Sequence, residues 1–68
     1  MYTVVISING GRERRFQSKY CNAKDEAYLH GECVEGEVVR VYKDDELIDS
    51  VYFRGVLREG GQWYRSMQ

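Results

Sequence analysis

Apolar and polar residues alternate over the first eight positions of the chain, which is the two-residue period of a β-strand with one buried face. The side chains that would share that face are those of Tyr2, Val4, Ile6 and Ile8. The next two residues, Asn9-Gly10, both tolerate the positive φ of a tight hairpin turn, and Gly11 could add a bulge. We therefore predict a strand that ends in a hairpin.

The segment that follows the hairpin is more polar. Between Arg12 and Lys19 the only large apolar residue is Phe16. Charged side chains on a strand commonly protect an exposed edge from pairing with another chain. We expect this second strand to be partly exposed, at an edge of the sheet.

The pattern changes to a helical period from Asn22 to about Val34. Asn22 is a favourable N-cap, and two acidic residues follow in the first turn. The residues at helical spacing are Ala23, Ala27, His30 or Gly31, and Val34. Gly31 lowers helix propensity or allows close packing on the sheet, and Gly36 is the expected stop.

Strand patterns return in the second half of the chain. A third strand is predicted over residues 37–42, and Lys43-Asp44-Asp45-Glu46 has turn chemistry. A fourth strand over residues 47–53 would direct Leu47, Val51 and Phe53 inward. Residues 56–58 and 62–65 flank Glu59-Gly60-Gly61, which indicates another hairpin or a bent extension of the sheet.

The predicted element order is β-β-α-β-β-β, in one small domain that spans residues 1–68. Short turns can join all sequential strand pairs, so the sheet should be mostly antiparallel. We expect an α+β fold with a four- to five-stranded antiparallel sheet and one helix packed on one face. The other face is then open to water, and function is expected there.

Tyrosine and arginine are the residues that this open face should display. The strand parity places five side chains on it: Arg40, Tyr42, Ile48, Tyr52 and Arg54. Tyrosine and arginine are enriched at interface hot spots. Cross-strand pairing that merely stabilises the sheet is the alternative explanation for each tyrosine.

Charge is segregated along the chain although the formal net charge is only −1. The basic segment contains Arg12, Arg14, Arg15, Lys19 and Lys24 against Glu13 alone. The acidic segment contains Asp25, Glu26, Glu32, Glu35 and Glu37. Such segregation can steer a charged partner.

No catalytic constellation is visible in the sequence. There is no Ser-His-Asp or HExxH arrangement, and His30 and Cys33 lack a third group to orient them. One histidine and no CxxC spacing argue against a metal site. A helix between Cys21 and Cys33 would hold them roughly 18 Å apart, so two free thiols are expected. We predict no enzyme activity and no cofactor.

The cellular location follows from two further features. No apolar run approaches the roughly 20 residues that span a bilayer. The first residues lack the basic region and small-residue cleavage site of a signal peptide. We expect a cytoplasmic protein with no membrane partner.

The partner predicted from these features is a protein or nucleoprotein complex. The residues expected to contact it are Arg12, Arg14, Arg15, Tyr42, Tyr52 and Arg54. Nucleic acid bound by the basic hairpin is the alternative, although the sequence pI of 5.7 is acidic. The acidic segment could instead mimic nucleic acid, and a homodimer through an exposed strand edge also stays open.

One resemblance extends these expectations. The run from Asn22 to Val41, a predicted helix followed by "CVEGEVVRV" at Cys33–Val41, is similar in layout to an anti-CRISPR family that blocks a type I surveillance complex. The resemblance covers about half of the chain and involves no residue motif. It implies a bacteriophage protein that inhibits a host complex in the host cytoplasm.

Overall fold

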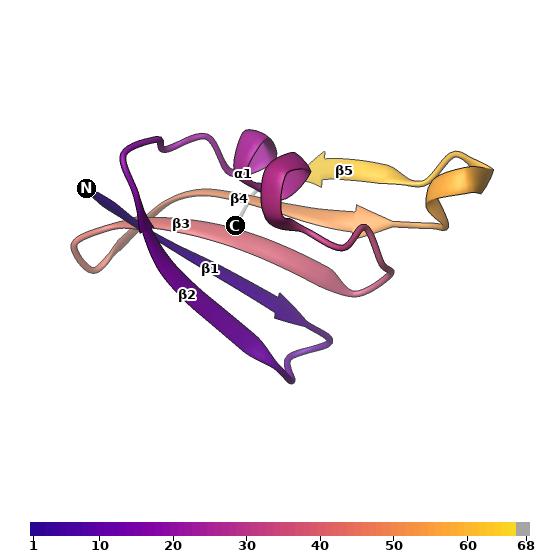
Figure 1. Ribbon diagram of the computed structural model, residues 1–68, viewed down its shortest axis with the longest axis horizontal. Coiled ribbons are helices and arrows are strands. Elements are labelled where there is room, and N and C mark those ends of the chain that lie inside the picture. Colours follow the sequence, from indigo (N-terminus) through magenta and orange to yellow (C-terminus); the bar gives the residue numbers. More distant parts are fainter. Residues whose placement is uncertain (67–68) are drawn as a thin grey trace.

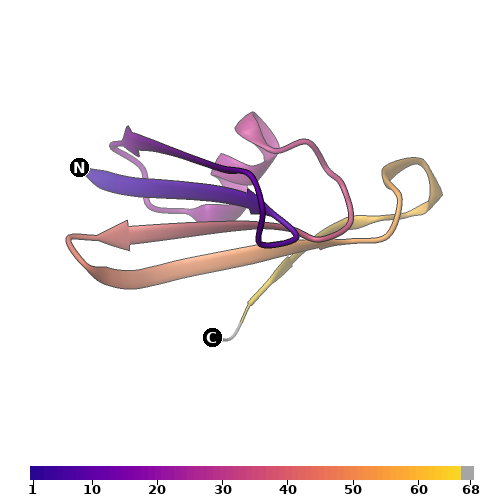
Figure 2. The same ribbon diagram turned by 90° about the horizontal axis from the view of Figure 1, so that it is seen from below.

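Five antiparallel strands form one sheet, and an α-helix packs on one of its faces (Figures 1 and 2). The structure is a computed structural model that describes residues 1–66. The elements in chain order are β1 Tyr2–Ile8, β2 Glu13–Ser18, α1 Ala23–His30, β3 Glu37–Lys43, β4 Glu46–Arg54, the 3-10 turn η1 Leu57–Glu59 and β5 Gln62–Arg65. The strand order across the sheet is β2-β1-β3-β4-β5. The predicted α+β fold is confirmed.

The first hairpin has the geometry that its sequence predicts. Asn9 and Gly10 have φ values of 52° and 70°. The Gly11 N–H donates to Ile8 O at 2.9 Å, while the Ile8 N–H donates to Arg12 O at 3.3 Å, so Gly11 is the extra, bulged residue. β2 lies at one edge of the sheet, as predicted. Pairing of two copies along this edge stays a prediction.

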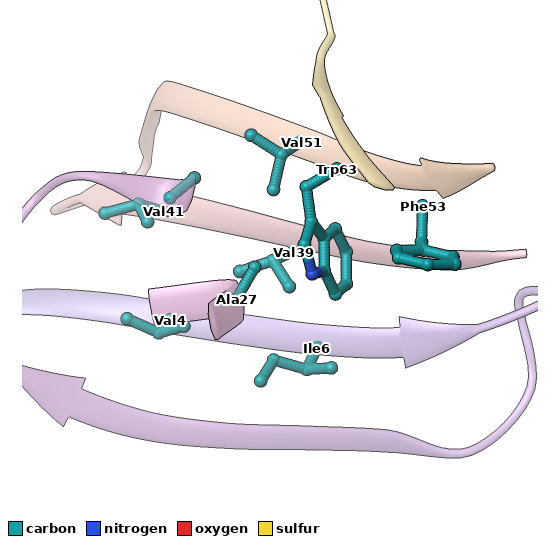
Figure 3. Packing of buried hydrophobic residues seen from close by; sticks show 9 residues of the cluster. Val4, Ile6, Ala27, Val39, Val41, Val51, Phe53 and Trp63 are labelled. Atoms are coloured by element: carbon teal, nitrogen blue, oxygen red, sulfur yellow. The ribbon is translucent and has the colours of Figure 1, made fainter. Parts of the chain in front are cut away.

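The hydrophobic core lies between α1 and the sheet. It consists of side chains from both layers: Val4, Ile6, Val39, Val41, Val51, Phe53, Trp63, Ala23 and Ala27. Figure 3 shows the sheet residues of this cluster lying together beneath Ala27. Because side chains alternate along a strand, each strand that lines the core contributes every second residue.

The helix begins where the sequence predicts and ends four residues earlier. The Asn22 side chain accepts the N–H groups of Lys24 and Asp25 at 3.0 and 3.1 Å. The helix ends at His30 because Gly31 takes extended backbone angles, φ −77° and ψ 162°. A Cβ at Gly31 would lie 2.7 Å from a ring carbon of Trp63. Gly31 therefore allows close packing, and the predicted extension to Val34 is wrong.

The loop between α1 and β3 is held by a buried carboxylate. Glu37 is fully buried, and its carboxylate accepts the N–H groups of Glu32 at 3.0 Å and Cys33 at 2.9 Å, with Val34 at 3.4 Å. Cys33 has a positive φ of 59° within this loop. A carboxylate that accepts several N–H groups compensates the loss of its hydration. Glu37 thus accepts backbone N–H groups of the loop that have no partner in a helix or strand.

A bulge between β3 and β4 corrects the prediction for Leu47. Val41 lies opposite Asp49, but Tyr42 lies opposite Leu47, so Ile48 is the extra residue. Leu47 therefore lies on the same side as Tyr42 and is 38% exposed, outside the core. Asp49, opposite Val41, keeps the inward direction that it shares with Val51.

Asp49 connects the start of the helix to two strands. Its carboxylate accepts the Ala23 N–H at 2.8 Å and the Arg65 guanidinium at 2.5 Å. Burial alone would raise the pKa of Asp49, but the hydrogen bonds from Arg65 and Ala23 and the positive charge of Arg65 outweigh burial and lower it below 3.8. The ionised form of Asp49 therefore stabilises the fold.

We expect Gly31→Ala to destabilise the protein by about 1–3 kcal/mol, because the added methyl group collides with the Trp63 ring. Leu29→Ala, on the exposed side of the same helix, should change stability by no more than about 0.5 kcal/mol. Urea denaturation of both variants measures the difference. Equal stability of Gly31→Ala and the parent would contradict the packing described here.

Acidification should remove the contribution of Asp49. A lowered pKa in the folded state means that this stability is present above the unfolded pKa and is lost as pH falls from the ordinary aspartate value of 3.8 through the folded pKa. Asp49→Asn should be less stable at neutral pH and should lose less stability over that range. Parallel denaturation curves at several pH values test this, and identical pH profiles would refute it.

Candidate partner-binding face

The face of the sheet that α1 leaves uncovered, here called the open face, carries a distinct set of side chains. Strand register identifies its members as Thr3, Val5, Ser7, Glu13, Arg15, Gln17, Val38, Arg40, Tyr42, Leu47, Ser50, Tyr52, Arg54, Gln62 and Tyr64. The Gln17 side chain donates to the Thr3 hydroxyl at 3.0 Å, as expected for cross-strand neighbours. Within residues 1–66, no α-helix packs on the open face (Figure 2).

The three arginines of the first hairpin do not form one basic surface. Arg12 donates to the Glu32 carboxylate and Arg14 donates to the carbonyl oxygen of His30, each at 2.8 Å. Both therefore tie the hairpin to the end of α1, on the helix side of the sheet. Arg15 alone of the three lies on the open face. Strand alternation separates the predicted residues, since Arg14 shares the side of the core residue Ile6.

The acidic segment is also largely used within the fold. Glu26 is 2% exposed and accepts the Ser18 hydroxyl at 3.1 Å. Glu37 caps the loop after the helix, and Glu32 pairs with an arginine. Glu35 accepts the Gly55 N–H at 2.7 Å. Four of the five carboxylates proposed as a nucleic-acid mimic thus form contacts within the fold, and the mimic hypothesis stays a prediction.

Arg40 and Arg54 are different, because neither forms an ion pair with any residue in 1–66. Arg40 lies between Val5 and Ser50 on the neighbouring strands and is half-buried. Arg54 is exposed at the end of β4. A guanidinium presents five N–H donors that suit carboxylates and phosphates. These two side chains are available to an anionic group.

Tyrosines accompany the two arginines. Tyr52 and Tyr64 lie opposite each other on β4 and β5, and their rings stack with centroids 5.8 Å apart at 30°. Together with Arg54 they line a shallow hollow. Tyr42 lies at the other end of the face, where a second hollow also contains Thr3, Arg15, Asp44 and Asp45. The open face therefore has a cationic, aromatic end and a more acidic end.

The structure brings together four of the six predicted contact residues. Arg15, Tyr42, Tyr52 and Arg54 share the open face, whereas Arg12 and Arg14 do not. Tyr64 was not predicted as a contact residue, although its position next to the apolar Trp63 would have placed it outward by alternation. Arg40 also lies on this face, as strand parity predicts.

His30 and the two cysteines were the other side chains considered for chemistry, and His30 contacts its neighbours in the fold. The His30 ring meets Phe16 edge-on at 4.8 Å and lies 3.7 Å from the Glu26 carboxylate. Cys21 and Cys33 are both free thiols. Over residues 1–66 there is no group of three or more histidine, cysteine or acidic side chains that could hold a metal ion. The same residues include no helix long and apolar enough to cross a bilayer.

Comparisons with protein-family models, with curated proteins and with solved structures find no match.

The stacked tyrosine pair should be energetically coupled. In a double-mutant cycle with Tyr52→Ala and Tyr64→Ala, we expect a coupling energy of about 0.5–1 kcal/mol, since cross-strand aromatic pairs contribute on this scale. Denaturation of the two single variants and the double variant gives the value. Strict additivity of the two substitutions would show that the rings do not interact in solution.

Proposed function

We propose that this protein is a non-catalytic binding module that holds a protein partner on its open face. The observation that carries the proposal is the combination of two unpaired arginines with three tyrosines on one uncovered sheet face: Arg40, Arg54, Tyr42, Tyr52 and Tyr64. These residue types dominate the binding energy of protein interfaces. A rigid sheet also holds them in place before binding, which lowers the entropy cost of association.

A protein partner is favoured over nucleic acid for three reasons. Two of the three hairpin arginines are engaged within the fold. The acidic turn Asp44-Asp45-Glu46 lies at one end of the open face and would repel a phosphate backbone. The formal net charge is −1, whereas nucleic-acid-binding domains are usually basic.

The finer proposal concerns the identity of the partner. The similarity in layout of residues 22–41 to an anti-CRISPR family supports a phage-type inhibitor that binds a host protein or nucleoprotein complex in the cytoplasm. Inhibition would then arise because the open face covers a surface that the complex needs. This part of the proposal rests on architecture and not on shared residues.

The proposal is tested by capture from a bacterial lysate, with and without nuclease treatment, on three immobilised proteins. These are the parent, the Tyr52→Ala/Tyr64→Ala variant and a Tyr28→Ala control, which changes an exposed tyrosine of α1 on the other side of the sheet. We expect one protein or complex to bind the parent and the control, and its retention to fall about tenfold or more with the double variant. Thermal melts confirm that all three are folded.

Two results would contradict the proposal. Undiminished capture by the double variant, with loss in the Tyr28→Ala control, would move the interface to the helix side. Partners that disappear with nuclease treatment, together with recovered nucleic acid, would make this a nucleic-acid-binding protein.

A further inference from the structure

We infer that the segment bound by the open face is an extended, acidic stretch of the partner, with two carboxylates that pair with Arg40 and Arg54. This inference rests on the proposed function and specifies the chemistry of the partner. Three observations support it: the spacing of the two arginines, their lack of ion pairs and the side chains between them.

The spacing of the arginines matches a stretched peptide. Arg40 on β3 lies opposite Ser50 on β4, and Arg54 lies four residues beyond Ser50 on that strand. With a rise of about 3.3 Å per residue and about 4.8 Å between strands, the two Cα atoms are roughly 14 Å apart. An extended peptide has a similar rise, and residues four apart point to the same side of it. Carboxylates at positions i and i+4 of such a peptide would therefore reach both guanidinium groups.

The lack of an ion-pair partner makes both arginines suitable binding sites for carboxylates. Arg40 is half-buried between neighbouring strands, and Arg54 is exposed. No carboxylate within residues 1–66 pairs with Arg40 or with Arg54. An incoming carboxylate can form a bidentate, charge-assisted pair with each.

The side chains between and beside the arginines would hold the rest of the segment. Tyr52 lies between them along β4, and it stacks on Tyr64 beside the hollow that Arg54 lines. Tyrosine rings offer large, rigid contact area at low entropy cost. At the opposite end of the face, Asp44 and Asp45 would repel further acidic residues. The acidic stretch therefore has a limited length and lies over β4.

The test uses synthetic peptides as probes and fluorescence anisotropy as the readout. The first probe is a fluorescein-labelled ten-residue peptide of threonine and valine with two glutamates four residues apart. The second has glutamine in place of both glutamates, and the third has the glutamates three residues apart, so that they face opposite sides. A ten-nucleotide oligothymidine is the fourth probe.

We expect the first peptide to bind the parent protein about tenfold or more tightly than the second and third. Arg40→Gln and Arg54→Gln should each remove most of that preference. Arg58→Gln is the matched control, because Arg58 is an exposed arginine in η1, outside the open face. The Arg58→Gln variant should bind the first peptide as tightly as the parent does. Raising the salt concentration should weaken binding of the first peptide only.

Three outcomes would overturn the inference. They are equal binding of the glutamate and glutamine peptides, equal sensitivity to Arg58→Gln and Arg54→Gln, and tighter binding of oligothymidine through the same two arginines. The proposed function fails separately: if the tyrosine double variant loses its captured partner while no acidic peptide binds, the open face is still the interface and only the acidic segment is refuted.

Discussion

The arrangement of the two layers depends on one buried carboxylate. Glu37 begins the central strand β3 and accepts N–H groups from three consecutive residues of the preceding loop, beginning with Glu32. This fixes the path by which the chain leaves the helix and returns to the middle of the sheet. The same loop places Gly36 against the first hairpin, where the Asn9 N–H donates to Gly36 O at 2.8 Å. The hydrogen bonds of this one side chain and of Gly36 thus connect the helix, the central strand and the hairpin.

Charges on the two sides of the sheet serve different purposes. On the helix side, acidic and basic groups bond to each other or to backbone groups, so that the short helix and its loops are fixed despite a small core. On the open face, Arg40 and Arg54 contribute to no such contact with a carboxylate of the described chain. Unpaired cations have little value for folding, since an exposed arginine is well solvated. The position of Arg54 beside the stacked Tyr52 and Tyr64 supports the proposed role in binding.

Much of the fold follows from local patterns, and the failures have tertiary causes. Alternation predicted the strands, Asn22 predicted the start of the helix, and the polar second strand predicted an edge. The end of the helix depends on how closely Gly31 approaches Trp63, which no local pattern contains. The bulge that turns Leu47 outward depends on pairing with β3. The division of the hairpin arginines could have been foreseen, because Arg14 has the same parity as Phe16 and Arg15 does not.

Two adjacent residues of strand β5 lie on opposite faces of the sheet. Trp63 is 1% exposed in the core, and Tyr64, its neighbour, is 40% exposed on the open face. β5 has four residues and pairs with β4 alone, so local opening of this edge would uncover the core. A partner that covers Tyr64 must also hold Trp63 in place. If the proposed function holds, binding at the open face and packing of the core would be thermodynamically coupled through one short strand, and the bound protein would be more stable than the free one.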